Sequence, residues 1–180
     1  LSELLLGGLF AGSYLELGFS PELFGMLLAL SVLLPLVLYD LAHQILPPPL
    51  LSGFVAISAA TSLASDPSSE AFLLSFMVAL IPAVFLALIH FLSRGRAMGL
   101  ADVPFVFGLG LLFGAPAAFP GLVISFWIGA VIGIIVLLGR PRGSRMGIEV
   151  PFAPFLAAGF ILAYFTQWNP FAFLASLALF

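Results

Sequence analysis

Long apolar stretches follow one another along the chain and are separated by short breaks rich in polar residues, proline or glycine. Stretches of this length and composition are typical of α-helices that cross a bilayer. The apolar tail from 167 to 180 has three possible assignments, namely the end of the last span, an interfacial segment or another helix. The pattern predicts an all-α, polytopic transmembrane helical bundle of about 6–7 spans. The predicted spans are 1–17, 22–39, 50–64, 71–92, 100–114, 121–139 and 151–166.

Several breaks carry recognisable turn signals. Ser20 is followed by Pro21, which predicts a helix that begins there with Ser20 as its N-cap. Residues 40–46 are predicted to extend the second helix into the interface, and three consecutive prolines at 47–49 end it, because proline lacks the N–H that a helix interior needs. The Pro-rich segment 115–120 is predicted as a tight turn between the fifth and sixth spans.

Composition strengthens the membrane assignment. Hydrophobic residues make up 63% of the 180 residues and charged residues 7%, and the mean hydropathy is +1.28. So few polar side chains cannot cover the surface of a soluble domain, which places the chain in the polytopic membrane class. The lack of cysteine excludes disulfides and thiolate metal sites, and the sequence has no basic patch that would suit a nucleic acid.

The basic residues predict the orientation of the chain in the membrane. All five are arginines, and all lie in two loops, 93–99 and 140–149. The positive-inside rule places both loops in the cytoplasm, and the two spans between them return the chain to the same side. Counting spans from these loops places the acidic turns, including Glu22 and 65–70, on the opposite side. The arginines are Arg94, Arg96, Arg140, Arg142 and Arg145.

Two aspartates stand at the edges of predicted spans. Asp40 ends the second span and Asp102 opens the fifth, so both are predicted at similar depth near the cytoplasmic interface. An acid in a membrane segment indicates a functional site. Two neighbouring carboxylates titrate as a pair, in which the ionised member activates water and the protonated member donates to a carbonyl, as in aspartic proteases. The alternative is that both are interfacial residues, with Asp102 as the N-cap of its own helix.

Four segments resemble motifs of the type IV prepilin peptidases and occur in the order of that family. Residues 40–47 (DLAHQILP) resemble the first active-site motif, an Asp followed by a polar or basic patch and Ile-Pro. Residues 98–103 (MGLADV) resemble the Gly-x-Gly-Asp signature. Residues 150–156 (VPFAPFL) are similar to the Pro-Phe-Gly-Pro-Phe stretch of the late membrane region. Residues 1–5 (LSELL) are similar to the Val-Glu-Leu-Leu segment that follows the cytosolic domain of the family.

The resemblance implies an aspartic endopeptidase of the bacterial cytoplasmic (inner) membrane. Such enzymes remove, on the cytoplasmic side, the leader of prepilins and pseudopilins of type IV pili and type II secretion systems. The implied partners are the prepilin leader, its hydrophobic helix and the lipid bilayer, with no nucleic acid, cofactor or metal. Asp40 and Asp102 would be the catalytic pair. Pro47, Met98, Gly99 and Ala101 would shape the site, and His43 and Gln44 would be candidate substrate contacts.

The chain departs from the family pattern in three ways. Ala101 replaces the second glycine of the signature, which matters if that position needs a positive φ or a close backbone approach. Pro104 replaces a lysine that often follows the second aspartate, so a cation and a helix N–H are lost. No segment of residues 1–180 resembles the first helix or the cytosolic domain of the family, so we expect these residues to form a single membrane-embedded peptidase domain. Zinc binding and methylation of the new N-terminus are therefore not expected.

Two other functions stay open. A non-enzymatic channel or transporter subunit would use the acids to move protons or cations, but such proteins usually carry their sites at mid-membrane and show internal repeats. A catalytically degenerate family member would bind pilins without cutting them, as Ala101 and Pro104 suggest. Loss of leader cleavage on substitution of either aspartate would favour the peptidase.

Overall fold

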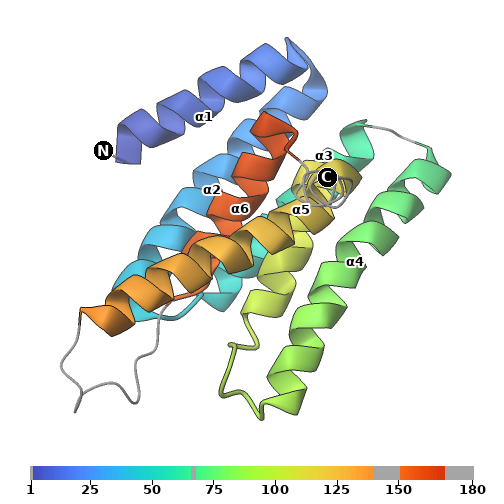
Figure 1. Cartoon of the computed structure of the whole chain (residues 1–180). Helices are drawn as coiled ribbons and strands as arrows, with labels where there is room; N and C mark the ends of the chain where they lie inside the picture. The colour runs from blue at the N-terminus through green and yellow to red at the C-terminus, as the bar shows by residue number, and fades with distance from the viewer. Residues whose placement is uncertain (1, 66–67, 140–150, 169–180) are drawn as a thin grey trace, which may run out of the picture.

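The computed structural model describes residues 2–65, 68–139 and 151–168, which form a bundle of helices (Figure 1). These residues contain six α-helices and no strand. The all-α class predicted from the apolar pattern is therefore confirmed. In chain order the helices are α1 (Ser2–Leu17), α2 (Pro21–His43), α3 (Pro48–Ser65), α4 (Ser69–Leu92), α5 (Asp102–Leu138) and α6 (Ala153–Thr166).

Four helices in the described part of the chain are long and apolar enough to cross a membrane. They are α2, α3, α4 and α5, whose most apolar windows have mean hydropathies of 2.1, 1.3, 2.8 and 2.7. The other two helices are shorter, with 16 residues in α1 and 14 in α6. The chain is thus a helical membrane bundle, as predicted. The predicted arginine loop 140–149 and most of the apolar tail lie outside the described residues.

The predicted tight turn at 115–120 is wrong. These residues are helical, and α5 extends over 37 residues. The interruption lies at Gly114, whose φ of 70° and ψ of −175° suit glycine and strain any other residue. Pro116 falls in the first turn after this break, where a helix does not need the missing N–H. Figure 1 shows the half of α5 beyond Gly114 turning back along the bundle, so α5 makes two passes.

α2 begins at the predicted signal but ends at His43, three residues before the predicted end at 46. Ser20 caps the helix, because its side chain accepts a hydrogen bond from a backbone N–H in the first turn at 3.2 Å, as predicted. The helix ends at His43, and Gln44 adopts a left-handed conformation with φ of 57°. The Gln44 N–H donates to the Asp40 carbonyl at 2.7 Å. Because α3 begins at Pro48, the connection is short and Asp40 stays close to the end of the bundle.

The first half of α5 lies between α3 and α4, where glycines allow close approach. A Cβ at Gly108 would lie 2.7 Å from the Phe54 ring on α3. A Cβ at Gly110 would lie 2.9 Å from the Cα of Ala79 on α4. In a bilayer, helices associate largely through van der Waals contact, so small residues at such contacts stabilise the bundle. The largest fully buried side chains include Phe54, Phe105, Phe160, Met26, Leu30 and Leu36.

Candidate active site

Asp40 lies in the last turn of α2 and is held by the start of α6. Its side chain is 6% exposed, and its Oδ2 accepts a hydrogen bond from the backbone N–H of Ala153 at 3.3 Å. Ala153 is the first residue of α6, so this N–H has no partner inside its own helix. Phe152, at the N-cap, supplies no side-chain acceptor. Asp40 therefore satisfies an open helix N-terminus, a position that stabilises negative charge.

Asp102 is the first residue of α5 and is 8% exposed. Its Oδ2 accepts a hydrogen bond from the Gly99 N–H at 3.1 Å. The N-cap is Ala101, which makes no side-chain cap bond. Asp102 thus bonds backward to the preceding loop, whereas an N-cap side chain bonds forward into the helix. The alternative prediction that Asp102 is the N-cap of its own helix is therefore wrong.

The two aspartates line one cavity of about 430 Å³, where α2 ends and α5 begins. Each carboxylate is fixed on this wall by one backbone N–H, that of Ala153 for Asp40 and that of Gly99 for Asp102. Two acids brought together in this way resist ionising at the same time, so one can hold a proton while the other is charged. Such a pair can act as general acid and general base at once. The rest of the wall consists of Gln44, Ile45, Leu46, residues 95–101, Pro151 and Phe152.

The other residues singled out in the sequence fall into two groups. His43 does not line the cavity; it is exposed, and its ring lies against Tyr39 with centroids 4.4 Å apart. Pro47 also lies off the wall, and its carbonyl accepts the N–H of Leu51 at 2.9 Å in the first turn of α3. The structure places the other four, Gln44, Met98, Gly99 and Ala101, on the wall of the cavity that the two aspartates line.

The departures from the glycine–aspartate signature fit the local backbone. Ala101 has φ of −68° and ψ of −21°, a helical conformation that alanine adopts without strain. Pro104 is the third residue of α5, where an N–H would have no partner inside the helix. Proline at this position therefore removes no helical hydrogen bond. A Cβ at Gly99, in contrast, would lie 3.3 Å from Oδ2 of Asp102, so glycine at position 99 leaves room for the carboxylate.

Two features of the cavity escape the sequence pattern. The N–H of Ala153 donates to Asp40, which lies 113 residues earlier in the chain. Every residue except proline has a backbone N–H, so the residue types in the sequence do not identify this donor. The one available signal is the resemblance of 150–156 to a family motif. Arg96 stands in the sequence as one of several loop cations, whereas in the structure it lines the same cavity as the two aspartates. Its place shortly before Asp102 is the signal that could have indicated this.

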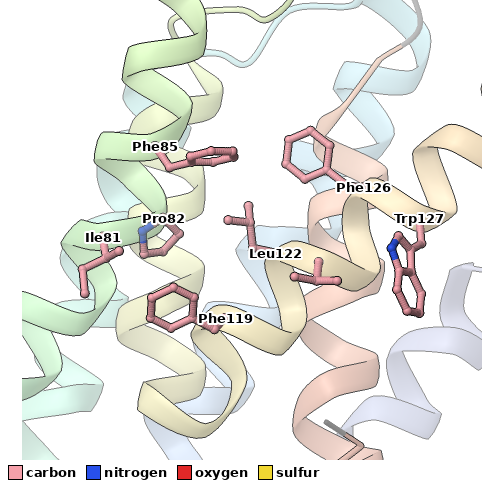
Figure 2. A pocket seen from close by; sticks show the side chains of 8 residues that line it. Ile81, Pro82, Phe85, Phe119, Leu122, Phe126 and Trp127 are labelled. Atoms are coloured by element: carbon pink, nitrogen blue, oxygen red, sulfur yellow. The ribbon is translucent and has the colours of Figure 1, made fainter. Parts of the chain in front are cut away.

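A second cavity, of about 300 Å³, lies between α4 and the second half of α5 (Figure 2). Phe85 and Phe126 face each other across it, with ring centroids 6.1 Å apart. Its wall carries no acid, base or nucleophile, so we do not consider it a site for hydrolysis. The lining residues are Ile81, Pro82, Phe85, Phe119, Leu122, Val123, Phe126 and Trp127.

The fold and the site together define a polytopic helical membrane protein with a buried carboxylate pair at one end of its bundle. Its sequence matches the Type IV leader peptidase family over residues 27–134, a range that includes both aspartates. The chain belongs to this family of peptidases, and the resemblance drawn from its short motifs is confirmed.

Three relatives described as prepilin leader peptidase/N-methyltransferase are similar to the chain. The protein from Bacillus subtilis (strain 168) is 29% identical over 178 residues, which cover 99% of this chain and 70% of the relative. The protein from Legionella pneumophila is 31% identical over 82% of this chain and 52% of the relative. The protein from Myxococcus xanthus (strain DK1622) is 31% identical over 80% of this chain and 44% of the relative. No solved structure matches the chain.

Proposed function

We propose that this chain is an aspartic endopeptidase that cuts the leader from type IV prepilins or pseudopilins, with Asp40 and Asp102 as its catalytic pair. One observation carries the proposal: two buried carboxylates, from helices far apart in the sequence, share one cavity. The description of the relatives as prepilin leader peptidases supports the choice of substrate.

In the proposed reaction, the ionised aspartate takes a proton from a water molecule, whose oxygen attacks the carbonyl carbon of the scissile peptide. The protonated aspartate donates its proton to the carbonyl oxygen, which gives a tetrahedral diol. The aspartate that took the proton from water then gives it to the amine nitrogen as the C–N bond breaks, and the other aspartate takes a proton from one hydroxyl of the diol, so the pair again holds one proton. Each carboxylate is held at Oδ2 by one backbone N–H, so both are oriented before the substrate arrives.

The loop beside the cavity supports a cytoplasmic position for this reaction. It carries Arg94 and Arg96, and the positive-inside rule favours such loops on the cytoplasmic side. In a bacterium this is the inner face of the cytoplasmic membrane. The position of both acids at the end of the bundle also favours a peptidase over a channel or transporter, which would hold its acids nearer mid-membrane.

Substitution of either aspartate tests the proposal. The chain is co-expressed with a prepilin in cells that lack their own prepilin peptidase, and leader removal is followed by the mobility of the pilin on an immunoblot. We expect Asp40→Asn and Asp102→Asn each to slow cleavage by at least about 100-fold, because one carboxylate cannot supply both proton transfers. Glu22→Gln is the matched control, since this acid lies at the opposite end of α2 and should not affect cleavage.

The purified chain separates the peptidase from a pilin-binding relative that does not cut. An active pair gives a cleavage rate that falls on both sides of a pH optimum, with one limb from each carboxyl group. Full cleavage by both aspartate variants would refute the proposal. Binding of prepilin by the wild-type chain without cleavage at any pH would identify the degenerate family member instead.

A further inference from the structure

The loop between α4 and α5 holds an interaction that the proposed reaction does not use. His90, half-buried in the last turn of α4, places its Nδ1 2.9 Å from the carbonyl oxygen of Met98. A carbonyl oxygen only accepts hydrogen bonds, so Nδ1 carries the hydrogen and donates it. The ring of His90 therefore holds the backbone of the loop three residues before Ala101.

The Met98 carbonyl and the N–H that holds Asp102 belong to one peptide group. The Met98 C=O and the Gly99 N–H lie in one plane and point in opposite directions. The first accepts from His90, and the second donates to Oδ2 of Asp102 at 3.1 Å. Rotation of this peptide plane would break both bonds together. A hydrogen bond to the carbonyl also polarises the N–H and strengthens it as a donor.

The surrounding loop brings the imidazole to this carbonyl. Gly95 has φ of 75°, and its N–H donates to the His90 carbonyl at 2.8 Å, so the chain turns tightly over the ring. A Cβ at Gly95 would lie 3.3 Å from Cε1 of His90. On the other side of the bond, the Met98 side chain is buried in the core. The buried Met98 side chain and the His90 ring thus hold this peptide group from opposite sides.

We propose that His90 is a positioning residue, which sets the orientation of the Met98–Gly99 peptide and, through its N–H, the place of the Asp102 carboxylate. The effect on cleavage rests on the proposed function. The link between the imidazole and the Gly99 amide is independent of it and is measured separately.

Three substitutions at position 90 test the effect on cleavage. His90→Phe keeps the ring and loses the donor. His90→Asn places an amide N–H near the position of Nδ1, whereas His90→Gln places it near Nε2, out of line with the carbonyl. We expect His90→Phe and His90→Gln to lower kcat for leader cleavage by about 10- to 100-fold with KM little changed, because a catalytic group is misplaced while the rest of the wall is intact. His90→Asn should recover most of the activity.

Ser93→Ala is the matched control within the same loop. It removes the bonds of Ser93 Oγ to the His90 carbonyl and from the Ala97 N–H, and it leaves the imidazole bond in place. We expect its kcat to stay near that of the wild type. A fall as large as that of His90→Phe, or no difference between the Asn and Gln variants, would mean that general loop stability explains the effect and would overturn the proposal.

NMR measures the link without relying on activity. Labelling with carbonyl-¹³C methionine and ¹⁵N glycine selects two peptide groups in this sequence, Met98–Gly99 and Met146–Gly147. The Gly99 amide proton should move upfield in His90→Phe and His90→Gln, as its hydrogen bond weakens, and stay near its wild-type position in His90→Asn. Gly147→Ala assigns the second signal, which serves as the internal reference.

The outcomes separate the two proposals. A Gly99 amide that does not respond in a folded His90→Gln or His90→Phe protein would overturn the positioning role. A Gly99 amide that responds in a chain that cleaves no prepilin would support the positioning role and count against the proposed function. If His90→Phe is not recovered folded, the comparison of the Asn and Gln variants decides the question alone.

Discussion

Replacing Ala101 by glycine tests the backbone conformation next to Asp102. Ala101 has φ of −68° and ψ of −21°, which both alanine and glycine adopt. Glycine has more freedom to lose on folding, so it is the less stable residue in this conformation. Glycine is preferred to alanine at many N-caps, but that preference belongs to extended cap residues, and Ala101 is helical. We therefore expect Ala101→Gly to destabilise the chain.

The size of the effect has two parts. The backbone contributes about 0.4–1 kcal/mol at a position whose conformation suits alanine. The methyl group of Ala101 is half-buried and packs against the core, so its removal adds a part of the ~0.8 kcal/mol typical of a buried methylene. Together these lower the free energy of unfolding by about 1 kcal/mol. Because no strain is relieved, cleavage should not become faster.

Unfolding of the purified protein in one detergent measures the change in the free energy of unfolding. Leader cleavage under the same conditions measures the change in the cleavage rate. Ala130→Gly calibrates the assay, because it places glycine at an exposed interior position of α5, where a loss of about 1 kcal/mol is expected. A glycine variant at 101 that is both more stable and faster would refute the reasoning. It would mean that alanine obstructs a conformation or an approach that the site needs.

Two further predictions concern glycines of α5. Gly110→Ala should lower the free energy of unfolding by about 1–3 kcal/mol, because α4 must move away from the added Cβ. Gly133→Ala is its control in thermal unfolding, since an added Cβ there meets no heavy atom within 4 Å, and equal losses in the two variants would contradict the packing described. Gly114→Ala should lower the free energy of unfolding by about 1–3 kcal/mol, because position 114 has a positive φ. Thermal unfolding measures this loss as well. A Gly114→Ala protein as stable as the wild type would place the break elsewhere, such as at 115–120.

Much of the helical frame follows from the sequence. In a bilayer every backbone polar group needs an internal partner, so each long apolar stretch predicts a helix. Ser20 predicts the start of α2 correctly because capping is a local interaction. The position of the helix break within 114–120 does not follow from the sequence. Glycine and proline both mark turns, and the local sequence does not indicate which of them interrupts the helix. Gly114 breaks it, and Pro116 then fits the first turn of the next half.

The sequence by itself singled out Asp40 and Asp102 and predicted that they lie at similar depth, since spans and arginines can be counted along the chain. Only the tertiary structure decided that Asp40 and Asp102 share a cavity and that the Ala153 N–H, 113 residues away, holds the first of them. It also decided that Ala101 is helical and that His90 reaches the peptide beside Asp102. The physical reason is that lateral neighbours of a helix, and the dihedral angles of a loop closed between two helices, depend on packing between distant segments rather than on local sequence.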